Sequence, residues 1–76
     1  MNLEQFLAGV QILRQYYNNP DGYHLDADHD IIYLYPTDRP LTPEHVTDLL
    51  DLGWFQPDQV EEEFVYDPDN AWQAYT

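Results

Sequence analysis

The chain contains no cysteine, no serine and no lysine. Without cysteine it has neither disulfides nor thiolate metal sites. The missing serine, cysteine and lysine also exclude the common nucleophiles, the Schiff-base lysine and the phosphate-binding lysine of a P-loop. What remains for catalysis is carboxylates, four threonines and three histidines. An enzyme built from these is an alternative, although so small a protein rarely supplies the supporting residues that a preorganised active site needs. We therefore expect a protein that is not an enzyme and that carries no cofactor.

Long apolar runs are also missing. The strongest runs, Ile31–Tyr35 and Leu49–Leu52, are far shorter than the roughly 20 residues that a membrane-spanning helix needs. The N-terminus has no basic segment ahead of an apolar stretch, which a secretion signal would require. We expect a cytoplasmic protein that does not associate with membranes.

Positive charge is nearly absent. The 76 residues include 15 Asp and Glu against two arginines, which gives a net charge of −13. Small soluble domains usually carry a net charge of about 2–8 in magnitude. A surface this acidic repels nucleic acid and attracts basic surfaces, such as the groove of a protein that binds DNA or RNA. Because 43% of the residues are apolar, we expect one folded domain over residues 1–76 rather than disorder.

The first helix is predicted over Leu3–Tyr17, where apolar residues recur at helical spacing. Asn2 and Gln5 have the spacing of a capping box at its start, and Pro20 lies in the turn that ends it. Gly9 interrupts the helix and would allow a neighbouring element to approach closely.

The second helix has signals at both ends. Thr42 is placed to act as its N-cap, with Pro43 in the first helical position and Gly53 as the left-handed residue after its end. Leu41 and Val46 have the spacing of a hydrophobic staple.

Strands are predicted at Tyr23–Leu25 and Ile31–Tyr35, joined by a polar bend at Asp26–Asp30. Two further strands are predicted, at Trp54–Phe55 and Ala71–Tyr75. The order α-β-β-α-β-β predicts an α+β domain, with an antiparallel sheet of three or four strands and both helices on one face.

The spacing of Asp26, Asp28 and Asp30 raises the question of a metal site. An EF-hand loop requires Gly at its sixth position and Glu at its twelfth, where this chain has Ile31 and Thr37. A transition-metal site with the neighbouring histidines is an alternative. Aspartates in polar bends more often accept hydrogen bonds from the backbone, and we therefore expect no metal.

Grouped carboxylates beside aromatic residues are typical of a protein-binding surface, where aromatics anchor the contact and charges steer it. A line of carboxylates can also imitate the phosphates of DNA and compete for the arginines and lysines that hold them. A plain solvated acidic surface is the alternative. The candidate partner-binding residues are Asp58, Glu61, Glu62, Glu63, Asp67 and Asp69, then Asp26, Asp28 and Asp30, with Tyr66 and Tyr75 as aromatic anchors.

Several stretches resemble a set of small acidic proteins encoded by phages and prophages. The resemblance rests on Gly22–Tyr23, Ala27–Tyr33, Leu52–Trp54 and a late Trp72, and Asp28 stands where those proteins usually have Glu. It implies an origin in a mobile element and gives no residue a catalytic role. In composition the chain is also similar to acidic phage inhibitors, namely anti-CRISPR, antirestriction and uracil-glycosylase inhibitor proteins.

The resemblance and the charge together predict an inhibitor that mimics nucleic acid in the host cytoplasm. Its expected partner is a basic nucleic-acid-binding protein or ribonucleoprotein complex of the host, with no direct binding to nucleic acid, and an anti-CRISPR protein is the leading kind. A small acidic structural or regulatory adaptor without mimicry is the alternative, followed by a metal-binding protein. Both a monomer and a homodimer are compatible with the sequence.

Overall fold

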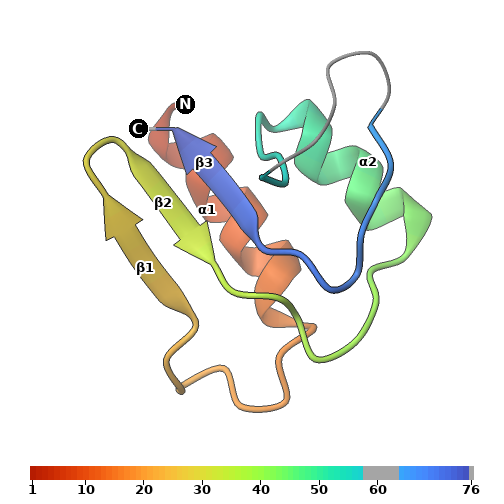
Figure 1. The fold of residues 1–76 in the computed structure, drawn as a ribbon. Coiled ribbons are helices and arrows are strands. Elements are labelled where there is room, and N and C mark those ends of the chain that lie inside the picture. The colour runs from red at the N-terminus through yellow and green to blue at the C-terminus, as the bar shows by residue number, and fades with distance from the viewer. Residues whose placement is uncertain (58–63, 76) are drawn as a thin grey trace.

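A computed structural model describes residues 1–57 and 64–75. It contains two helices and three strands: α1 (Leu3–Arg14), β1 (Leu25–Asp28), β2 (Ile31–Leu34), α2 (Pro43–Asp51) and β3 (Trp72–Tyr75). The strands form one antiparallel sheet in the order β1-β2-β3. In Figure 1, α1 lies behind β2 and β3, and α2 lies to their right, beyond β3. The predicted α+β class is confirmed, and of the three or four antiparallel strands predicted, the described residues form three.

The strand expected at Trp54–Phe55 is reduced to a single antiparallel bridge between Phe55 and Gln73. The described order is therefore α-β-β-α-β rather than the predicted α-β-β-α-β-β. The bridge cannot extend as a ladder in either direction. On one side the next donor would be Pro57, which has no N–H, and on the other the N–H of Gly53 already donates to Leu50 at the end of α2.

The first hairpin begins later than predicted. The strand expected at Tyr23–Leu25 runs over Leu25–Asp28, and the turn is confined to His29 and Asp30. His29 adopts a φ of 54°, in the left-handed region that tight turns use. Pairing with β2 sets the length of β1, so Asp26 and Asp28 are strand residues even though aspartate is a poor strand former.

The N-terminus of α1 has the predicted capping box. The Asn2 side chain accepts from the Gln5 N–H at 2.8 Å, and the Gln5 side chain accepts from the Asn2 N–H at 2.9 Å. The helix ends at Arg14, three residues before the predicted end at Tyr17, and continues as a turn.

Helix α2 has the ends that the sequence predicts. The Thr42 side chain accepts from the His45 N–H, and Gly53 has a φ of 95°. The N–H of Trp54 donates to the Leu49 carbonyl at 2.9 Å, and the N–H of Gly53 donates to the Leu50 carbonyl at 3.0 Å. These two bonds form a Schellman motif.

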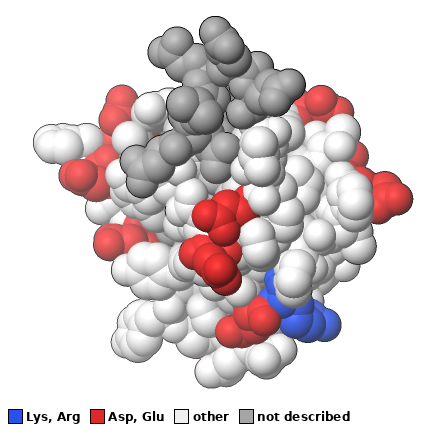
Figure 2. Space-filling view, turned by 45° about the vertical axis from the view of Figure 1, so that its right-hand side comes forward, with Lys and Arg blue, Asp and Glu red and all other residues white. Residues whose placement is uncertain are grey.

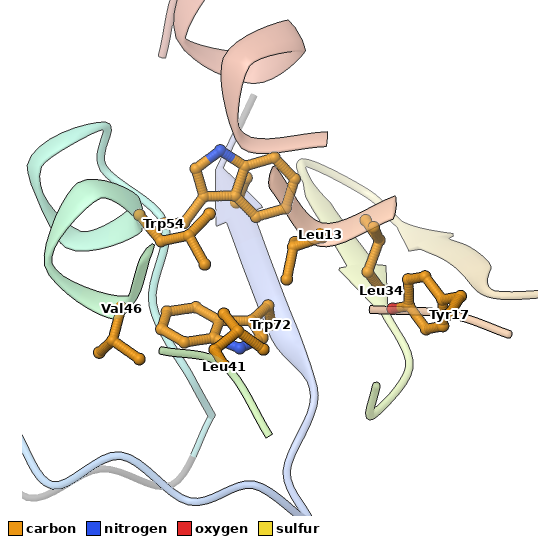
Figure 3. Close-up of a cluster of buried hydrophobic side chains, with 9 residues drawn as sticks. Leu13, Tyr17, Leu34, Leu41, Val46, Trp54 and Trp72 are labelled. Atoms are coloured by element: carbon orange, nitrogen blue, oxygen red, sulfur yellow. The ribbon is translucent and has the colours of Figure 1, made fainter. Parts of the chain in front are cut away.

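The core forms where the helices and the inner face of the sheet meet. Figure 3 shows Trp54 and Trp72 in the middle of the cluster, with Val46 at one end and Tyr17 at the other. Trp54 is 1% exposed and stacks on Phe6, with ring centroids 5.7 Å apart. The buried apolar residues are Leu13, Tyr17, Leu34, Leu41, Val46, Leu49, Trp54, Trp72 and Ala74.

Tyr16 joins the end of α1 to the start of α2. Its hydroxyl lies 2.5 Å from Nδ1 of His45 and accepts from the Thr42 N–H at 3.3 Å. Just beyond it, Asp38 accepts from the Asn18 N–H at 2.7 Å and donates its own N–H to the Tyr16 carbonyl. The connector before α2 is thereby tied to the C-terminal end of α1.

Candidate acidic interaction surface

Alternation along the strands gives the sheet one apolar and one mixed face. Leu34, Trp72 and Ala74 point to the core, so Tyr33, Gln73 and Tyr75, which alternate with them along β2 and β3, point the other way. Gln73 is nevertheless buried, at 7% exposed. By register, Asp26 pairs with Tyr33, and Ile31 lies between Asp28 and Tyr75. This outer face is turned toward the viewer in Figure 1, and none of the helices in residues 1–57 and 64–75 covers it there.

The structure brings two of the predicted carboxylates together on this face. Asp26 and Asp28 occupy alternate positions of β1, and all four residues of that strand are exposed. One Asp26 oxygen accepts from the Ala27 N–H at 2.8 Å, and the other accepts from the Tyr35 hydroxyl at 3.3 Å. Asp26 therefore has the backbone-capping role that its type favours, and its carboxylate is held in one place. Asp30 follows in the turn.

Tyrosine rings lie beside these carboxylates. Tyr35 is 44% exposed and Tyr75 is 54% exposed. The Tyr75 ring packs against Phe55 with centroids 5.0 Å apart, which limits its motion. Tyr33 is half-buried between them. The outer face thus presents ordered aromatic rings next to carboxylates.

Asp67 and Asp69 lie in a separate turn that is fixed to the core by Gln56. The Gln56 side chain is 1% exposed; it donates to the Asp67 carbonyl at 2.7 Å and accepts from the Asp67 N–H at 2.9 Å. Within the turn, the Asp67 carboxylate accepts from the Asp69 N–H at 2.9 Å. Sequence reasoning missed Gln56, and no local pattern marks a lone glutamine as buried.

Tyr66, expected to be an aromatic anchor, packs inward. Its ring stacks on Trp72, with centroids 6.2 Å apart, and its hydroxyl accepts from the Leu41 N–H at 2.9 Å. Of the two expected anchors, Tyr75 is the one with an exposed side chain. The remaining predicted residues, Asp58, Glu61, Glu62 and Glu63, lie outside the described residues.

Positive charge near the carboxylates is scarce. The Asp28 carboxylate lies 3.9 Å from Nε2 of His29, a pair that is ionic only when the histidine is protonated, and both side chains are highly exposed. Arg39 donates to the Gln15 carbonyl and lies over the Tyr16 ring, so its charge is directed at neutral groups. On the face of the molecule that Figure 2 shows, the acidic side chains form separate groups, and the basic side chains are confined to one small area. The acidic surface on that side is divided, not continuous.

The described part of the chain shows neither a group of three metal-ligating side chains nor a helix long and apolar enough to cross a bilayer. His24, one of the alternative ligands, instead stacks on Tyr17 at 4.1 Å between centroids, and its ring nitrogen contacts the Asn19 carbonyl.

Comparison of the chain with protein-family models, with curated proteins and with solved structures gives no match.

Proposed function

We propose that this protein is a non-enzymatic inhibitor of phage type that binds the basic nucleic-acid-binding surface of a host defence complex, as an anti-CRISPR protein does. The observation that carries the proposal is a net charge of −13 in a chain with two arginines and no lysine. Carboxylates without neutralising partners attract a basic surface over a distance of several ångströms and accelerate association with it.

Fixed carboxylates support a binding role over simple solubility. A solubilising carboxylate needs no particular position, whereas Asp26 and Asp67 are each held by hydrogen bonds to the backbone. Groups held in place before binding lose less conformational entropy when a partner docks.

A purified CRISPR effector ribonucleoprotein and its target DNA provide the direct test. The protein should reduce DNA binding by the free effector, and an effector already bound to DNA should resist it, because both ligands require the same basic groove. The inhibition constant should rise steeply between 50 and 500 mM salt, since ionic screening weakens charge attraction (the Debye length is about 10 Å at 0.1 M).

A panel of other basic targets serves as the control for the kind of partner. A restriction endonuclease and a uracil-DNA glycosylase should be tested in the same competition format. Inhibition of one of these enzymes instead of the effector would support mimicry of nucleic acid and would identify a different target. Binding that persists with DNA already in every groove would contradict mimicry and favour the second candidate.

That second candidate is an acidic adaptor that binds a protein partner without imitating nucleic acid. The specific observation in its favour is the exposed tyrosine pair, Tyr35 and Tyr75, because aromatic anchors are common in protein–protein interfaces and a pure phosphate mimic does not need them.

A further inference from the structure

We propose that the outer face of the sheet is an arginine-binding surface that contacts guanidinium groups of a basic protein partner. We call it the tyrosine–aspartate face and define it by Asp26, Asp28, Tyr33, Tyr35 and Tyr75. The inference rests on the proposed function for the basic character of the partner. It adds the place of contact and the side chain that is recognised.

The register of the strands places the two kinds of group side by side. One row across the sheet runs from Asp26 to its neighbour Tyr33, and the next runs from Asp28 through Ile31 to Tyr75. Neighbouring strands lie about 4.8 Å apart, so Asp26 and Tyr33 are within reach of one planar group. The first row therefore places a carboxylate next to a tyrosine and ends at the buried Gln73, whereas in the second row Ile31 separates the carboxylate from the tyrosine on β3.

The hydrogen bonds of Asp26 leave it able to bind a cation. The Ala27 N–H and the Tyr35 hydroxyl use one lone pair on each of its oxygens. A carboxylate offers about four acceptor sites, and two remain for a guanidinium. Because the Tyr35 hydroxyl donates to the same carboxylate, a cation at Asp26 lies next to the hydroxyl end of Tyr35.

This combination suits arginine better than lysine. A guanidinium can bond a carboxylate through two parallel N–H groups and stack flat on a tyrosine ring, whereas an ammonium group is a compact, strongly hydrated charge. A second copy of this chain fits the face poorly, because pairing it with itself would bring Asp26 and Asp28 against like charges.

Two peptides of equal charge, nona-arginine and nona-lysine, separate recognition from general attraction. With the full chain at 100 mM salt, calorimetry should give a dissociation constant about fivefold lower for nona-arginine, as expected for two exposed ring contacts. Backbone amide NMR shifts on the unmodified protein should cluster in β1, β2 and β3. This mapping requires no variant to fold.

Matched variants test each half of the face. Replacing both tyrosines (Tyr35→Leu with Tyr75→Leu) should abolish the preference for arginine, while Tyr23→Leu, at a 98% exposed position outside the face, should leave it unchanged. Asp26→Asn with Asp28→Asn should weaken nona-arginine binding more than Asp48→Asn with Asp51→Asn, which removes the same charge from α2.

Each of four results would contradict the arginine-binding surface. These are equal affinity for the two peptides, an equal loss of nona-arginine affinity in the two double asparagine variants, NMR shifts that map to another surface, and no binding of either peptide. None of these results decides the proposed function, which depends on competition between the protein and target DNA for the effector. Failure of that competition, with arginine recognition intact, would instead remove the inhibitor proposal and leave this surface.

Discussion

Gly9 is the residue where packing and helix propensity make opposite demands. An ideal Cβ at this position would lie 2.0 Å from Nε1 of Trp54 and 2.3 Å from Cε2 of the same ring. The indole also donates to the Gln5 carbonyl at 3.3 Å, one turn earlier in α1. The missing side chain thus creates the space in which the Trp54 ring packs against α1.

Gly9→Ala should therefore destabilise the fold. In an exposed helix interior, alanine in place of glycine gains up to about 1 kcal/mol. Here the Trp54 ring must move, and overpacking typically costs about 1–3 kcal/mol. Chemical denaturation should show a lower unfolding free energy for Gly9→Ala and nearly no change for Gln11→Ala on the exposed side of α1. A Gly9→Ala variant more stable than the parent would mean that Trp54 does not occupy this site.

Tyr17 gives the molecule a pH dependence at the alkaline end. Burial, and to a smaller extent the nearby Asp38 carboxylate, together raise the pKa of Tyr17 from 10.0 to about 12. The folded state therefore keeps the phenol proton at pH values where the unfolded chain has lost it. Stability from this group is complete below pH 10 and is lost as the pH rises toward 12.

The measurement is the melting temperature of the parent and of Tyr17→Phe between pH 8 and 12. The variant should be less stable at pH 8, by about 0.5–1.5 kcal/mol, because the hydrogen bond to the Tyr35 carbonyl is lost. The difference between the two proteins should shrink as the pH approaches 12. A constant difference over this range would show that Tyr17 does not titrate with a raised pKa.

At the scale of elements, the helices could be predicted because their signals are local. The capping box at Asn2 and the residues that end α2 act within one turn of chain, and both are found as the sequence predicts. The predicted close approach at Gly9 is also confirmed. What local signals could not give is the position of β1, which depends on pairing with a strand further along the chain.

The candidate surface was predicted less well, for the same reason. Asp26 and Asp28 were assigned to a bend because aspartate favours bends, but pairing with β2 places them on a strand face beside tyrosines. Tyr66 and Tyr75 look alike in sequence, since both are tyrosines in the acidic last third. The stacking of Tyr66 on Trp72 is a contact between side chains that the sequence does not reveal.

The turn that carries Asp67 and Asp69 depends on one buried amide. Gln56→Met should lose the hydrogen bonds of the Gln56 side chain and leave the Asp67 N–H and carbonyl without those partners. Each lost hydrogen bond contributes about 0.5–1.5 kcal/mol, so the unfolding free energy should fall by about 1–3 kcal/mol. Gln11→Met, at an exposed position of α1, is the matched control and should change little. Equal stability of the two variants would contradict the role of Gln56 in holding this turn.

At the scale of the whole molecule, the charge opposes folding. The molecule measures 35 × 26 × 21 Å along its principal axes. The Debye length is about 30 Å at 0.01 M salt and about 3 Å at 1 M, so all carboxylates repel one another in the first case and only near neighbours in the second. Compact folding at low salt therefore has to overcome repulsion across the entire domain.

Salt should consequently stabilise the protein and weaken its complexes. The melting temperature should rise from 0.01 to 1 M sodium chloride, while the affinity for a basic partner falls over the same range.

Asp48→Asn with Asp51→Asn should raise the low-salt melting temperature, because it removes two negative charges from α2, whose last turn has no basic residue. It should also flatten the salt dependence of the melting temperature. A melting temperature that does not respond to salt would show that the carboxylates do not repel one another strongly in the folded state.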